Sequence, residues 1–147
     1  MYEELKKRIK EHEGYRNTVY KDSLGFATIG YGHLLTPQDA FVEGHEYSDK
    51  LLNGLFETDF FEARRNAERL IEDNKCTHIV FKAKCVIIEM VFQLGIGGVS
   101  KFKKMWEALN KEDYGEASFQ MMDSRWANQT PARAKSLSEI MRSCKDN

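Results

Sequence analysis

The sequence predicts an α+β fold that is mostly α. A small β-hairpin lobe covers about residues 14–58, and a larger helical lobe covers about residues 72–147 together with the first helix. Short β-prone runs lie near the N-terminus, whereas apolar residues at helical spacing fill most of the remaining chain. A chain of 147 residues is long enough to form one domain with a hydrophobic core.

The first expected element is a short amphipathic helix. Tyr2, Leu5 and Ile9 recur at three- and four-residue intervals, and Gly14 is a natural stop. Glu13 is therefore expected in the last turn of this helix.

A β-hairpin is expected next, over residues 16–31. Two β-prone runs, residues 18–20 and 26–31, are separated by the turn-forming sequence KDSLG. Asp22 falls in the turn, and Thr28 falls in the second strand.

Two helix-start signals follow the hairpin. The sequence TPQD at 36–39 offers an N-cap, a proline at the first helical position and an acid three residues after the cap. It predicts a short helix that ends at Gly44. Ser48 and Asp49 then cap a segment with helical apolar spacing for about twenty residues, which is expected to join the two lobes.

The helical lobe is expected to form around one buried helix. Residues 79–94 are apolar nearly all round, and Gly95 is expected to end that helix. Further helical patterns carry apolar residues between 102 and 121, and Thr130-Pro131 marks the start of the last helix.

Composition narrows the function class. The chain is 41% hydrophobic and 31% charged, as is usual for a soluble protein, and 22 basic residues nearly balance 23 acidic ones. We therefore expect a monomer with no nucleic-acid partner and no stable membrane association. The N-terminus does not read as a signal or an anchor, and no later segment is expected to span a membrane, so synthesis in the cytoplasm is predicted.

The cysteines predict neither a disulfide framework nor a zinc site. Cys76, Cys85 and Cys144 are odd in number and include no C-x-x-C pair. Three reduced, packed thiols are expected, because Cys85 and Cys144 lie on apolar helical patterns. A cysteine–histidine catalytic pair is the disfavoured alternative. We expect no metal and no cofactor.

Glu13, Asp22 and Thr28 offer the chemistry of a glycosidase site. One carboxyl can protonate the leaving oxygen while a second group directs the nucleophile, and carboxyls in different environments can divide these roles. Each residue alone also has an ordinary interpretation: a solvated helix acid, a turn residue and a β-branched strand residue.

The motifs around these residues resemble the phage lysozymes of the T-even type. Eight residues separate Glu13 from Asp22, five separate Asp22 from Thr28, and Thr28 opens the sequence TIGYGH. The sequences MVFQLG at 90–95 and SRWANQTPARA at 124–134 look like helical-lobe signatures of the same family. The resemblance covers roughly residues 9–142 and implies a lysozyme-like fold of two lobes.

The resemblance implies a muramidase for host-cell lysis. It would cut the β-1,4 bond between N-acetylmuramic acid and N-acetylglucosamine in bacterial peptidoglycan, with inversion. Glu13 would be the general acid, while Asp22 and Thr28 would hold the attacking water. The helix dipole favours the protonated form of Glu13, and a nearby cation, Arg133, would oppose that effect. Such a site needs carboxyls roughly 6.5–9.5 Å apart. Without a signal, the enzyme would reach the wall through a separate membrane pore.

The resemblance also implies supporting residues. Arg133 is expected to pair with Glu13 and orient it, and His33 is expected to pair with Asp59 for stability rather than catalysis. Trp126 is expected to pack rather than to stack on a sugar. The positions that match the family's sugar-binding cleft are Leu34, Phe92 and Gln93.

Some features depart from the family pattern. The segment between His33 and Asp59 is shorter, and Met105 and Gln120 replace two polar residues of the cleft. The near-neutral charge predicts weaker adsorption to an anionic wall than a basic relative would show. Two alternatives stay open: a lytic transglycosylase, which has less need of Asp22 and Thr28, and a non-catalytic wall-binding or tail module, which could dispense with Glu13.

Overall fold

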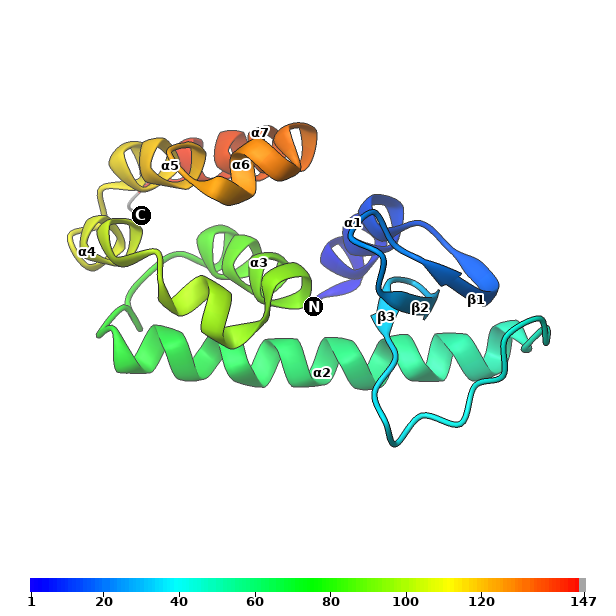
Figure 1. Ribbon diagram of the computed structural model, residues 1–147. Helices are drawn as coiled ribbons and strands as arrows, with labels where there is room; N and C mark the ends of the chain where they lie inside the picture. The colour runs from blue at the N-terminus through cyan, green and yellow to red at the C-terminus, as the bar shows by residue number, and fades with distance from the viewer. Residues whose placement is uncertain (146–147) are drawn as a thin grey trace. The chain divides into compact units, whose positions relative to one another are not determined.

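The computed structural model describes residues 1–145, shown in Figure 1. These residues contain seven helices and one three-stranded antiparallel sheet, which confirms the predicted α+β, mostly α class. Contacts divide the chain into an N-terminal unit, residues 1–62, and a C-terminal unit from residue 63 onward. The N-terminal unit includes the first helix. The predicted lobe boundaries, which grouped that helix with the helical lobe, stay a prediction.

The N-terminal unit begins with α1 (Glu3–Glu13), which ends as predicted at Gly14. Gly14 adopts φ +73° and donates its N–H to the Lys10 carbonyl at 3.0 Å. The helix buries Leu5 and Ile9, and just before it the Tyr2 ring meets the Phe60 ring edge-on at 5.7 Å. The buried apolar residues of this unit are Tyr2, Leu5, Ile9, Ile29, Leu52, Phe56 and Phe60.

The sheet consists of β1 (Arg16–Lys21), β2 (Ala27–Gly30) and β3 (His33–Leu34), in that order. The first two strands confirm the predicted hairpin. The third was not predicted, and it pairs with β2 through a tight turn. Gly30, the last residue of β2, and Gly32, in the turn itself, adopt φ +65° and +75°, a backbone region that favours glycine.

The predicted short helix over residues 36–44 is wrong, because this segment forms turns and irregular structure. Asp39 N–H does bond to the Thr36 carbonyl at 3.0 Å, which makes a single turn. However, the Asp39 carboxylate accepts from Thr36 N–H at 2.7 Å and also contacts His33. The bond from Thr36 N–H is the one expected of a capping box, so Asp39 makes its local contact although no helix follows, and His33 binds it from outside the segment.

The long helix is present as α2 (Asp49–Asp73), and Ser48 caps it by accepting from Leu51 N–H at 3.1 Å. The division between the two units falls inside this helix, after Glu62.

The described part of the C-terminal unit, residues 63–145, consists of helices joined by short turns and contains no strand. Its helices after α2 are α3 (Phe81–Ser100), α4 (Lys103–Asn110), α5 (Tyr114–Met122), α6 (Arg125–Gln129) and α7 (Pro131–Arg142). Within this unit α5 packs against α4 and α7, and α7 also packs against α3. Pro131 is the first residue of α7, as predicted.

The buried helix α3 is longer than expected. Gly95 adopts φ +78° and interrupts the helix at the predicted end, but helical structure resumes beyond it. By length and composition α3 could cross a membrane, although the sequence was expected to contain no such segment. Half of its most apolar 18-residue stretch is buried inside the structure, as is usual for the core helix of a soluble protein. Cys76, Cys85 and Cys144 are buried free thiols, which confirms their prediction.

Candidate active site

Glu13, the expected general acid, is the last residue of α1, and its side chain is half-buried. The turn between β2 and β3 approaches it closely. A Cβ atom on Gly32 would lie 3.0 Å from Glu13 Cδ and closer still to Oε1. The Glu13 carboxyl group therefore lies against the Gly32 backbone, a neighbour that the sequence analysis did not identify.

Asp22 is held rigidly in the turn between β1 and β2. Its Oδ1 accepts from Leu24 N–H and Phe26 N–H, both at 2.9 Å. Its own N–H donates to the Phe26 carbonyl at 2.9 Å. Both side-chain bonds go to Oδ1, so Oδ2 accepts none from the described residues. A fixed carboxylate with one oxygen left over suits a group that binds water.

Thr28 lies in β2 directly opposite Tyr20 of β1 and is only 2% exposed. Its hydroxyl donates to the Phe26 carbonyl at 2.9 Å. Because the hydroxyl proton is already used, the Thr28 oxygen can offer a further ligand only its lone pairs. Thr28 can thus accept a hydrogen bond from water.

The charges of both expected acids act on the Tyr20 phenol. Burial raises the pKa of its phenol, the nearby charges of Glu13 and Asp22 raise it further, and Arg16 lowers it. The Arg16 guanidinium lies over the Tyr20 ring, 4.7 Å from its centroid. Both carboxyls are therefore within electrostatic reach of one phenol. Only its position two residues before Asp22 pointed to Tyr20 in the sequence.

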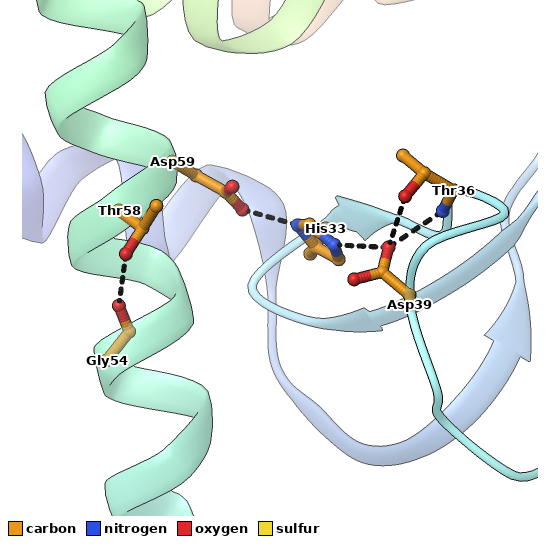
Figure 2. A network of polar contacts seen from close by, with 6 residues as sticks. All are labelled: His33, Thr36, Asp39, Gly54, Thr58 and Asp59. Carbon is orange, nitrogen blue, oxygen red and sulfur yellow. Dashed lines mark hydrogen bonds and ion pairs between the residues drawn. The ribbon is translucent and has the colours of Figure 1, made fainter.

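His33 forms the expected pair with Asp59, and Figure 2 shows that it also binds a second acid. His33 Nδ1 lies 2.8 Å from Asp59 Oδ2, and Nε2 lies 3.1 Å from Asp39 Oδ2. The hydrogen bond to Asp59 raises the pKa of His33 to about 9, against the opposing effect of burial and with help from Asp39. Burial opposes ionisation of Asp39, yet bonds from Thr36 and His33 lower its pKa. The charged His33 side chain thus links α2 to the segment after β3.

In the C-terminal unit, Gln93 supports Trp126. The Trp126 indole N–H donates to Gln93 Oε1 at 2.8 Å, and Gln93 Nε2 donates to the Thr130 hydroxyl at 3.3 Å. Trp126 is only 4% exposed and meets Phe102 edge-on at 6.1 Å, so the prediction that it packs is confirmed.

A hollow of about 750 Å³ lies beside Trp126 within this unit. Four cationic side chains line it, namely Lys101, Lys103, Lys104 and Arg125, against one acid, Asp123. Gln120 and the buried Met105, which depart from the family pattern, also line the hollow. Of the expected sugar-binding residues, Phe92 is half-buried on α3, whereas Leu34 is 52% exposed on β3.

Arg133 has a partner that the sequence analysis missed. Its Nε donates to Glu89 Oε2 at 3.0 Å, and Glu89 is fully buried on α3. The expected pairing of Arg133 with Glu13 stays a prediction. An acid inside an otherwise apolar helix was the available signal, because carboxylates are rarely buried without a partner.

Comparisons with known proteins show which family the chain belongs to. The phage lysozyme family matches residues 10–142. Probable T4-type lysozyme 1 of Dictyostelium discoideum is 30% identical, over 96% of this chain and 95% of that protein. The pre-baseplate central spike protein Gp5 of Enterobacteria phage T4 is 29% identical over 90% of this chain, which spans 26% of Gp5. Peptidoglycan hydrolase gp36 of Pseudomonas phage phiKMV is 26% identical over 92% of this chain and 15% of its own length.

The family match covers most of the chain, and the same stretch contains the acid, the fixed carboxylate and the hydroxyl described above. The chain therefore belongs to the phage lysozyme family and is a glycoside hydrolase of the lysozyme type.

Proposed function

We propose that the protein hydrolyses the β-1,4 bond between N-acetylmuramic acid and N-acetylglucosamine in bacterial peptidoglycan, with inversion at the anomeric carbon. The observation that carries the proposal is the pair of unlike carboxyls around Tyr20. Glu13 lies half-buried at a helix end, and Asp22 is fixed by two backbone N–H groups. Unlike surroundings are what let two carboxyls act as acid and base.

In the proposed reaction Glu13 donates a proton to the glycosidic oxygen as the bond from that oxygen to the anomeric carbon breaks. A water molecule attacks the anomeric carbon from the opposite face. Asp22 Oδ2 accepts one water proton, and the Thr28 oxygen accepts a hydrogen bond from the other. Proton exchange with solvent then restores both carboxyls. Leu34, Phe92 and Gln93 are proposed to bind the sugar, and Arg133 is proposed to orient Glu13.

Glu13→Gln tests the assignment. Removal of a general acid should lower the rate at least roughly a hundredfold while the fold is kept. Glu11→Gln, an exposed acid on the same helix, is the matched control and should keep full activity. The readout is product release from purified peptidoglycan. Wild-type activity in Glu13→Gln would overturn the assignment.

Mass spectrometry of the products separates the alternatives. Reducing ends that have gained water indicate hydrolysis, anhydro ends indicate a lytic transglycosylase, and no products indicate a wall-binding module. NMR of the first anomer released tests inversion, because retention would point to a covalent intermediate.

We also propose that the enzyme is made in the cytoplasm of the host and reaches the wall through a separately made membrane pore. Expression in bacteria should then cause lysis only when a pore-forming protein is expressed with it. Lysis without the pore would contradict this route.

A further inference from the structure

We propose that Gly32 is a positioning residue for Glu13: its lack of a side chain creates the space in which the acid's carboxyl group lies. This inference rests on the proposed role of Glu13. It assigns a function to the second glycine of TIGYGH, whose neighbours Tyr31 and His33 have structural contacts of their own.

The contact is specific to this glycine. A Cβ atom on Gly32 would lie 3.0 Å from Glu13 Cδ and 3.4 Å from Glu13 Cβ, and closer still to Oε1. Gly25 and Gly44 adopt similar positive φ angles, but a Cβ on either would have no atom within 4 Å in the described structure. Gly30 would only touch Leu52, at an ordinary 3.6 Å.

The backbone at Gly32 has little freedom to move away. On one side the Tyr31 ring packs against Phe56, with 5.5 Å between centroids. On the other side His33 is held by Asp59 and Asp39. A methyl group at position 32 must therefore displace the Glu13 side chain rather than the turn.

This displacement should affect catalysis more than stability. The Glu13 carboxyl is the end of a flexible side chain, so rotation of that side chain can relieve the clash without moving the backbone. The rotation, however, removes the acid from the position in which it protonates the leaving oxygen. Misplacement of a reacting group by about 1 Å can cost on the order of a hundredfold in rate.

Gly32→Ala and its control Gly44→Ala separate the two effects. Both place alanine at a positive φ, +75° and +84°, so both should lower the melting temperature by a similar amount. Only Gly32→Ala should also lower kcat, by roughly a hundredfold, with a smaller change in KM, and shift the limb of the pH–rate profile that Glu13 controls. A Gly32→Ala variant as active as Gly44→Ala would overturn the proposal.

A double-mutant cycle gives a second test. Glu13→Asp shortens the acid by one methylene and removes its carboxyl from the methyl at position 32. In that background Gly32→Ala should lower kcat only a few-fold further, since the two changes act on one contact. Full multiplication of the two losses would contradict the proposal. If Gly32→Ala is too unstable, Gly32→Asn adds a Cβ in a residue that tolerates positive φ better.

The result with Glu13→Gln separates this inference from the proposed function. If Glu13→Gln is inactive while Gly32→Ala and Gly32→Asn are fully active, only the role of Gly32 is wrong. If Glu13→Gln retains full activity, the assignment of Glu13 as acid fails, and with it the inference about Gly32.

Discussion

The two units bury charge in different ways. In the N-terminal unit, half-buried His33 lies between Asp59 and Asp39 and can lose its proton, with a pKa of about 9. In the C-terminal unit, the fully buried Glu89 meets Arg133, whose guanidinium stays charged at any ordinary pH. The His33 cluster makes the stability of the N-terminal unit depend on pH. The Arg133–Glu89 pair joins α7 to α3 through a cation that does not lose its charge.

Glu89→Gln should have the largest effect on stability. It keeps the size of the side chain but removes the buried carboxylate to which Arg133 Nε donates, and breaking a buried pair typically costs about 3 to 5 kcal/mol. The free energy of unfolding measured in urea checks this value. Glu68→Gln is the matched control, because Glu68 bonds Lys84 at 2.7 Å in a more exposed setting and should cost about 1 kcal/mol or less. Equal losses in the two variants would show that burial does not distinguish these pairs.

Asp59→Asn should have the next largest effect and should reveal the pH dependence. The pKa of His33 is raised from 6.5 to about 9 in the folded state, which corresponds to roughly 3 kcal/mol of stability. This contribution is fully present below pH 6.5 and is lost as pH rises through 9. The free energy of unfolding of the variant should therefore be lower than that of the wild type by up to this amount at pH 6, and by little above pH 9. Urea unfolding from pH 5.5 to 9.5 measures this, and a pH-independent loss would show that His33 is not the source.

Asp39→Asn should have the smallest effect of the three. Asp39 is the weaker partner of His33, at 3.1 Å, and it also accepts from Thr36 N–H and the Thr36 hydroxyl. We expect the free energy of unfolding to fall by about 1 kcal/mol and amide hydrogen exchange at Thr36 to become faster. NMR exchange rates check the local effect. A loss as large as that of Asp59→Asn would mean that the two acids hold His33 equally.

Much of the candidate site could be predicted from local sequence. Glu13 was placed at the end of a helix because apolar spacing and Gly14 define that helix, and Asp22 was placed in a turn by KDSLG. The Gly32 contact could not be predicted, since it joins a turn to a side chain nineteen positions earlier in the chain. Glu89 was missed for the same reason: its partner Arg133 is distant in sequence.

The sequence alone determined the fold class and the buried helix, because periodicity, caps and turn residues act over a few neighbouring positions, and its family resemblance singled out the candidate acids. Tertiary structure decided what those positions contact. It left residues 36–44 without a helix, with Asp39 bound to His33, and it added β3 beside β2. It also made Gln93 the hydrogen-bond partner of the Trp126 indole. Each of these outcomes depends on a partner brought close only by folding, which a local pattern does not specify.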